Sequence, residues 1–184
     1  MPDLTTDEDL VATAAAGDPA ALEALFDRYH RDLFRFLRRV AEPADAAEDL
    51  VQEVFLRVWK SARSFRPDGS FRGWLYRIAR NAAADEFRKS SRLAPVGVAV
   101  SPEDLPAPER VPGELAAALA RLAAADREVL VLARFHGLSG AELAAALECS
   151  TGAARVRLHR ALKRLRALYL ETQEEHRHAM RRVE

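Results

Sequence analysis

The chain has 184 residues, with 28 acidic and 28 basic side chains and a formal net charge of zero. This length suffices for one ordinary domain or two small ones. The single cysteine, Cys149, excludes an intramolecular disulfide and a cysteine-cluster metal site. The sequence also lacks both an apolar run approaching the ~20 residues of a membrane span and a signal-peptide pattern at its amino terminus. We therefore expect a cytoplasmic protein without membrane insertion.

The zero net charge hides a strongly uneven distribution. Cations predominate between residues 57 and 92, and between residues 150 and 170 there is no carboxylate at all. The compensating acids lie in the first 18 residues, in residues 42–53 and in residues 103–114. Such asymmetry, more than the net charge, indicates nucleic-acid binding by the basic segments.

Hydrophobic spacing is helical along the chain and no alternating strand is found, which predicts an all-α fold. Asp7 is expected to cap a first helix. Asp18 and Pro19 are expected to begin a second, because Asp suits the cap and Pro the first helical position. Asp45 is expected to cap a third helix that runs to about Ala62.

The next two helices differ in the chemistry of their outer faces. Residues 48–59 form an amphipathic helix with an acidic edge, which suits a protein partner. A turn-rich loop from Phe65 to Ser70 leads into residues 71–89, an amphipathic helix whose outer face is predicted to be basic and aromatic. Basic and aromatic groups together suit nucleic acid whose bases can be reached. On this helix we expect Trp74 in the core and Asp85 to pair with an arginine or act as a cap instead of touching DNA.

A proline-rich segment separates the first helical block from a second. Residues 93–113 contain five prolines and few large apolar residues, so we expect an extended or disordered linker. The second block is expected to hold helices over residues 114–124, 126–136, 139–147 and 150–170. Ser139 and Glu142 have the spacing of a capping box, and a charged tail is expected from Glu171.

The short connection Glu148-Cys149 between the last two helices predicts a helix-turn-helix. Ala154, Leu158 and Ala161 share the face expected to pack inward. The opposite face and its flanks are candidates for contacts with duplex DNA: Ser150, Gly152, Arg155, Val156, Arg157, His159, Arg160 and Lys163. The alternative is a helical hairpin with a solvated basic face. An outward-facing valine slightly favours DNA, because it can meet a thymine methyl group.

Three stretches in this order resemble bacterial RNA polymerase sigma factors: Glu48–Phe55, Phe71–Asn81 and the helix-turn-helix over Ser139–Leu168. The two-block layout is similar to the extracytoplasmic-function (ECF) type, and the resemblance covers residues 8–92 and 114–170. It implies two small helical domains joined by a proline-rich linker. Residues 1–92 would be sigma region 2, 93–113 the linker, 114–170 sigma region 4 and 171–184 a charged tail.

The resemblance also implies partners and roles. The protein would bind core RNA polymerase, recognise two promoter elements and help open the DNA, with an anti-sigma factor as a further partner. It would be nucleoid-associated in the holoenzyme, with no enzymatic activity, catalytic residue, cofactor or metal of its own. The surface that docks on the coiled coil of the largest polymerase subunit would comprise Asp49, Gln52, Glu53 and Leu56.

For promoter DNA, the resemblance implies a division between the two blocks. The loop from Phe65 to Phe71, with Asn81, would hold a base flipped from the non-template strand of the minus-ten element. Phosphates there would be contacted by Arg77, Arg80, Arg88 and Lys89. The last helix would read the minus-thirty-five element as duplex.

Two other classes of function fit the sequence less well. A conventional regulator that binds duplex DNA only through the helix-turn-helix leaves the basic-aromatic helix and the Phe65 loop unexplained. A hydrolase or metal-dependent enzyme is not supported, because the sequence contains no phosphate-cradling glycine loop and no nucleophile motif.

Overall fold

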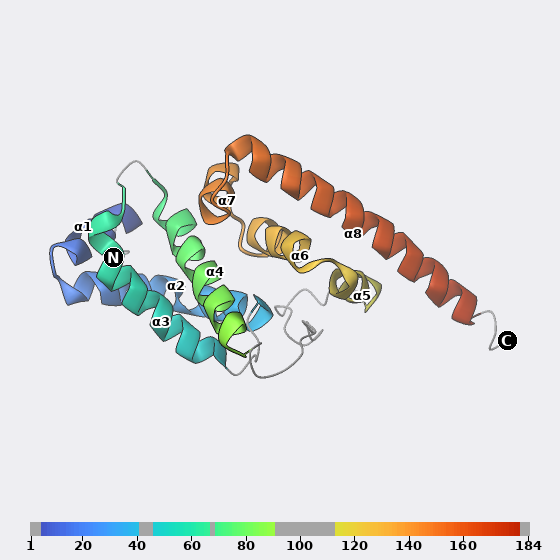
Figure 1. Cartoon of the computed structure of the whole chain (residues 1–184), viewed down its shortest axis with the longest axis horizontal. Coiled ribbons are helices and arrows are strands. Elements are labelled where there is room, and N and C mark those ends of the chain that lie inside the picture. The colour runs from blue at the N-terminus through green and yellow to red at the C-terminus, as the bar shows by residue number, and fades with distance from the viewer. Residues whose placement is uncertain (1–4, 41–45, 67–68, 91–112, 181–184) are drawn as a thin grey trace.

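The computed structural model describes residues 5–40, 46–66, 69–90 and 113–180, and these residues form helices and connecting turns without a strand. The helices form an amino-terminal block, α1 to α4, and a carboxy-terminal block, α5 to α8 (Figure 1). The all-α prediction is confirmed. The expected Asp45 cap and residues 93–112 of the expected linker lie outside the described residues.

The amino-terminal block contains α1 (Asp7–Ala15), α2 (Pro19–Val40), α3 (Ala47–Ser61), a 3-10 turn η2 (Ala62–Ser64) and α4 (Phe71–Ser90). The expected start of α2 is confirmed, because the Ala20 backbone N–H donates to Asp18 Oδ1 at 2.9 Å. The expected cap of α1 was wrong by one residue. Thr6 is the cap, forming a reciprocal capping box with Asp9, and Asp7 is the first helical residue.

Apolar stripes on α2, α3 and α4 meet in the core of this block. On α3 the buried side chains are those that helical spacing predicts: Leu50, Val51, Val54, Phe55 and Val58. Leu33, Phe36 and Leu37 of α2 are fully buried against them and against α4. The prediction that Trp74 belongs to the core is also confirmed, since it is 8% exposed.

The carboxy-terminal block contains α5 (Gly113–Arg121), α6 (Ala124–Leu130), a π-helical turn η4 (Val131–Phe135), α7 (Gly140–Ala146) and α8 (Thr151–Met180). A buried arginine holds α5 against α6. The Arg127 guanidinium donates to the backbone carbonyls of Leu119 at 3.0 Å, Ala120 at 2.8 Å and Leu122 at 2.9 Å. It thereby satisfies carbonyls that the end of α5 leaves without helical partners.

The predicted helix-turn-helix is formed by α7 and α8. Glu148, in the turn, has a φ of 52°, a left-handed conformation that non-glycine residues seldom adopt. The predicted capping box at the start of α7 is confirmed. The Glu142 N–H donates to Ser139 Oγ at 3.3 Å, and the Ser139 N–H donates to Glu142 Oε2 at 2.7 Å. Burial acts to raise the pKa of Glu142, but hydrogen bonds from Ser139 and Ser70 to its carboxylate, together with the charge of Arg72, outweigh burial and leave that pKa lowered.

Ser139→Ala should lower the free energy of unfolding by about 1 kcal/mol, because it removes the oxygen that caps α7. Chemical denaturation of the full chain measures this difference. Ser139→Asp is the matched control, since a carboxylate can accept the same backbone hydrogen bond. Equal stability of Ser139→Ala and the wild type would show that the capping box contributes nothing.

The last helix is longer than expected. We expected α8 to end near Leu170, but it continues to Met180. A contact from α5 explains the extension. Arg121 lies 3.0 Å from Glu171 and 3.6 Å from Glu175, which are one turn apart on α8. These two ion pairs stabilise the helical conformation of the residues beyond Leu170, which have no apolar face of their own.

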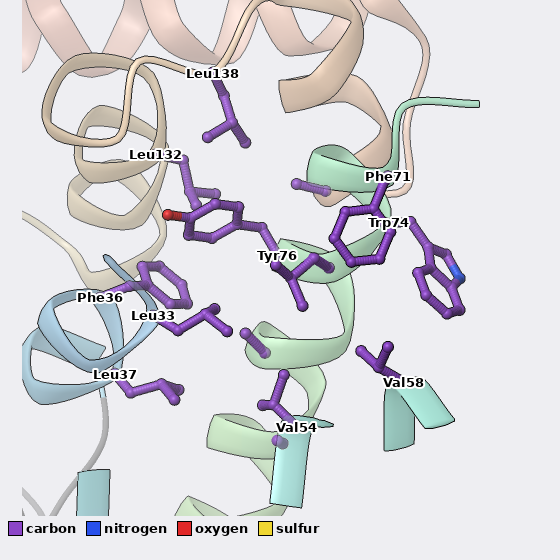
Figure 2. Packing of buried hydrophobic residues seen from close by; sticks show 14 of the residues in the cluster. Leu33, Phe36, Leu37, Val54, Val58, Phe71, Trp74, Tyr76, Leu132 and Leu138 are labelled. Atoms are coloured by element: carbon purple, nitrogen blue, oxygen red, sulfur yellow. The ribbon is translucent and has the colours of Figure 1, made fainter. Parts of the chain in front are cut away.

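The two blocks pack against each other through α4 and α7 (Figure 1). Buried residues of both blocks form one cluster, in which Leu132 and Leu138 of the carboxy-terminal block lie near Phe36 and Tyr76 of the amino-terminal block (Figure 2). Tyr76 is fully buried. The expectation of an aromatic outer face was therefore wrong for the described rings of α4, because Phe71, Trp74 and Tyr76 are all buried and the carboxy-terminal block covers Tyr76.

Candidate protein-docking and nucleic-acid surfaces

The outer face of α3 combines carboxylates with exposed apolar side chains. Asp49 and Gln52 are exposed, and Leu56 is 52% exposed. Trp59, one turn further, is 36% exposed at the edge of the core. A half-exposed leucine next to acidic residues is typical of a surface that another protein covers.

An ion-pair network links this face to α4. Arg57 Nε lies 2.7 Å from Glu53 Oε1, and Arg57 Nη1 lies 2.9 Å from Asp85 Oδ2. The hydrogen bond from Arg57 lowers the pKa of Glu53, and hydrogen bonds from Arg57 and Arg88 lower the pKa of Asp85. The predicted pairing of Asp85 with an arginine is confirmed. The Glu53 carboxylate is thus ionised at neutral pH, and the positive charge of Arg57 compensates part of its charge.

A cavity of about 210 Å³ lies where η2, the following loop and α4 meet. It is lined by Ser64, Phe65, Arg66, Gly69, Ser70, Trp74, Arg77 and Ala145. The Phe65 and Trp74 ring centroids are 5.3 Å apart, and Phe71 is fully buried next to both rings. The site therefore offers an aromatic wall and two arginines, the groups that a stacked base and its phosphate need.

The other predicted residues of the DNA site on α4 lie outside this cavity. Asn81 is exposed but does not line it, although it lies one turn beyond Arg77 on the same face of α4. Near the end of the helix, Arg88 pairs with Asp85 and Lys89 lies 3.4 Å from Glu86.

The other two predicted phosphate contacts, Arg77 and Arg80, pair with residues of the carboxy-terminal block. Arg80 Nε lies 2.7 Å from Glu128 Oε1, and its Nη1 donates to the Ala146 carbonyl at 2.7 Å. Arg77 lies 3.9 Å from Glu148. Sequence reasoning missed all three partners, because each lies at least 48 residues away along the chain.

The predicted duplex-reading face of α8 is open to solvent. All eight candidate residues are exposed, and Val156 is 48% exposed. Ala154 and Ala161, on the opposite side, are fully buried, as their spacing predicts. Ser150 caps the helix, because its Oγ accepts from the Ala153 N–H at 3.2 Å. The exposed part of α8 up to Leu170 therefore carries basic side chains and no carboxylate.

Comparison with known proteins identifies the class. Residues 25–93 match the family model of Sigma-70 region 2, and residues 113–165 match that of Sigma-70 region 4. The sigma factor NccH of Alcaligenes xylosoxydans xylosoxydans is 35% identical over 185 residues, covering 94% of this chain and 100% of NccH. The ECF sigma factor SigM of Mycobacterium tuberculosis is 34% identical, covering 91% of this chain and 87% of SigM. The chain belongs to the ECF sigma factors of RNA polymerase.

Solved structures give the same fold. CnrH, in complex with the cytosolic domain of CnrY, aligns with a TM-score of 0.67 and 33% identity over 88% of this chain and 96% of CnrH. The sigma factor RpoE of Bartonella quintana, in complex with the anti-sigma factor NepR, aligns with a TM-score of 0.64 and 27% identity over 79% of this chain and 94% of RpoE. In the described part of this chain, every helix is too short or too polar to cross a membrane.

Proposed function

We propose that this sigma factor binds core RNA polymerase through the outer face of α3 and recognises promoter DNA through α4 and α8. Asp49, Gln52, Glu53 and Leu56 would contact the polymerase. The observation that carries this assignment is the half-exposed Leu56 among carboxylates, on a helix whose other face is fully committed to the core. The protein acts by binding, and we assign it no reaction of its own.

We further propose that the cavity beside Phe65 holds a base of the opened non-template strand. Flipping a base costs a few kcal/mol, which stacking on Phe65 and Trp74 would offset. Arg77 at the cavity and Asn81 one turn beyond it would hold the backbone and the base edge. Phe71 would support Phe65 from the core instead of touching DNA, because its side chain is fully buried.

In the same proposal, the exposed face of α8 reads duplex DNA of the minus-thirty-five element. Weak contacts from each block would combine, because both belong to one chain and act at a high effective concentration. An anti-sigma partner is also proposed, on the surfaces used for polymerase, since the solved relative RpoE is bound to the anti-sigma factor NepR. Localisation in the cytoplasm, with the nucleoid when in holoenzyme, follows from this role.

Arg160→Ala should lower the affinity of the holoenzyme for promoter duplex by about tenfold, because a lost base or phosphate contact costs about 1–3 kcal/mol. Fluorescence anisotropy with a labelled promoter fragment measures this. Arg177→Ala is the matched control, because Arg177 is an exposed arginine in the distal part of the same helix. If both variants lost the same affinity for promoter duplex, the proposal that the first turns of α8 contact the DNA would be contradicted.

In vitro transcription tests the proposal as a whole. Purified core polymerase is incubated with genomic DNA of the source organism, with and without this protein, and the 5′ ends of the transcripts are mapped. New start sites should appear only when the protein is present, with shared sequence elements upstream of them. A regulator that binds only duplex DNA would produce no new start site without another sigma factor.

A further inference from the structure

We propose that α1 holds the cavity beside Phe65 in shape, and that Glu8 on this helix is a positioning residue for capture of the opened strand. Glu8 is half-buried and does not itself line the cavity. It acts through the backbone of α4, whose first turn carries part of the cavity wall. This inference rests on the proposed binding of a flipped base at the cavity, and it gives α1 a role in that binding.

The carboxylate of Glu8 caps α4 from a neighbouring helix. The backbone N–H of Phe71, the first residue of α4, donates to Glu8 Oε1 at 3.1 Å. The first N–H groups of a helix have no partner within the helix, and the helix dipole favours a negative charge beside them. Ser70 supplies the other contacts, because its Oγ accepts from the Gly73 N–H at 3.3 Å and its carbonyl oxygen accepts from the Trp74 N–H at 3.1 Å. The start of α4 is thus fixed partly by its own cap and partly by a residue 63 positions earlier in the chain.

The first turn of α4 supports the aromatic wall of the cavity. Phe71 and Trp74 both lie on this turn, and the centroid of the Phe71 ring is 6.0 Å from that of Trp74 and 6.1 Å from that of Phe65. Phe65 and Trp74 line the cavity, whereas Phe71 is fully buried next to them. A movement of the first turn would therefore change the spacing of the two rings on which a base is proposed to stack.

The start of α1 is itself anchored next to this turn. Tyr29 of α2 donates a hydrogen bond from its hydroxyl group to the Asp7 carboxylate, and its ring centroid lies 5.6 Å from that of Phe71. Arg28 Nη1 lies 2.9 Å from Asp7 Oδ1 and donates to the Thr5 carbonyl oxygen at 2.9 Å. Burial and the hydrogen bond to Asp7 raise the pKa of Tyr29 well above its usual value, so the hydroxyl group stays a donor at neutral pH. These contacts fix the residue that precedes Glu8.

The other end of α1 contacts the segment that precedes the cavity loop. The Arg63 guanidinium donates from Nε to the carbonyl oxygen of Ala15, the last residue of α1, at 3.3 Å. Ser64, the next residue along the chain, lines the cavity. α1 thus packs against both η2, which precedes the loop, and α4, which follows it. A helix that contacts both segments holds the two sides of the cavity at a fixed separation.

Glu8→Ala should weaken binding of the holoenzyme to a promoter fragment whose minus-ten region is already melted. The expected loss is about fivefold, because removing a helix cap shifts the equilibrium of the first turn toward frayed forms by about that factor. A fluorescent adenine analogue in the non-template strand reports the binding. Affinity for core polymerase should stay unchanged, since the substitution leaves the α3 face intact. Alanine is a good helix former, and the Thr6–Asp9 capping box of α1 is not altered.

Two variants serve as controls for Glu8→Ala. Glu8→Gln keeps a side-chain oxygen that can accept from the Phe71 N–H, so it should bind the melted promoter within about twofold of the wild type. Glu23→Ala removes an exposed glutamate from α2 and should bind as the wild type does. If Glu8→Gln lost as much affinity as Glu8→Ala, the hydrogen bond to α4 would have no positioning role, and the proposal would be overturned.

Combination with Phe65→Ala separates positioning of the cavity from a general loss of stability. Phe65→Ala removes a ring on which the base is proposed to stack, so it should weaken binding of the melted promoter by itself. If Glu8 acts through the cavity, Glu8→Ala should reduce affinity much less in a chain that already lacks the Phe65 ring. A general loss of stability would reduce affinity by the same factor in both chains, and that result would overturn the proposal.

Tyr29→Phe tests the same arrangement without changing Glu8. It keeps the ring against Phe71 but removes the hydroxyl group that holds Asp7, and it should weaken binding of the melted promoter by about twofold or more. Circular dichroism checks that each variant is folded. Unchanged binding for both Glu8→Ala and Tyr29→Phe would refute the role of α1 alone. Unchanged binding for Phe65→Ala would refute the proposed base site itself, and the role of α1 with it.

Discussion

Leu56→Glu is expected to weaken binding of the protein to core RNA polymerase by at least about tenfold. The leucine is 52% exposed on the acidic outer face of α3, and covering a leucine side chain contributes about 1.5–3 kcal/mol. Glutamate removes this contribution and places a further carboxylate in the proposed interface. It also keeps a good helix-forming residue at the position, so α3 should remain intact. Surface plasmon resonance with immobilised core enzyme measures the affinity.

The chain contains a matched control for this change. Leu170 is 48% exposed on α8, far from α3, and Leu170→Glu makes the same chemical change at nearly the same exposure. It should leave polymerase affinity unchanged. The docking assignment fails if both variants bind core enzyme as tightly as the wild type, or if both lose affinity to the same degree.

Phe36→Ala is expected to lower the free energy of unfolding by about 3–5 kcal/mol, the usual cost of truncating a fully buried phenylalanine. Phe36 has no exposed surface, and its ring lies 5.3 Å from the Tyr76 ring and 5.6 Å from the His136 ring. Removing the Phe36 ring would leave an empty space in the core where the two blocks meet (Figure 2). Urea denaturation followed by circular dichroism gives the difference.

Phe34→Ala on the same helix is the comparison for Phe36→Ala. Phe34 is only partly buried, with Arg38 5.9 Å from its ring centre, so its loss should cost much less. Similar costs for the two variants would show that Phe36 is not a central core residue. A separate early transition in the Phe36→Ala denaturation curve would indicate that the blocks part before either unfolds.

Local periodicity predicted the helices and buried faces of the amino-terminal block well. The stripe on α3 from Leu50 to Val58 is buried as its spacing requires, and the capping signals at Asp18 and Ser139 mark real helix starts. These features depend on residues within a few positions of each other. For the same reason, the exposed basic face of α8 could be predicted from the helical spacing of its alanines and arginines.

The failures concern contacts between distant segments. The outer face of α4 was expected to be basic and aromatic, but Tyr76 is buried on a second side of the helix, which is covered by a block that begins more than 30 residues later. The pairing of Arg80 with Glu128 and the extension of α8 beyond Leu170 depend on partners 48 and 50 residues away. A single helical period can identify a face, but it cannot say which other helix covers it.

Arg57 joins two helices to which different partners are assigned in the proposal. It pairs with Glu53 on the proposed docking face of α3 and with Asp85 on α4, the helix proposed to contact the opened strand. The ion pairs therefore tie these two surfaces together within the amino-terminal block.

Site-specific crosslinking shows whether the cavity beside Phe65 binds the opened non-template strand. A photoreactive amino acid replaces Ser64, an exposed residue at the cavity beside Phe65, and the labelled protein is combined with core polymerase and a promoter whose bubble is already melted. Crosslinks to non-template bases within the bubble are expected, only when core polymerase is present. Crosslinks confined to duplex DNA or to the template strand, or none at all, would contradict it.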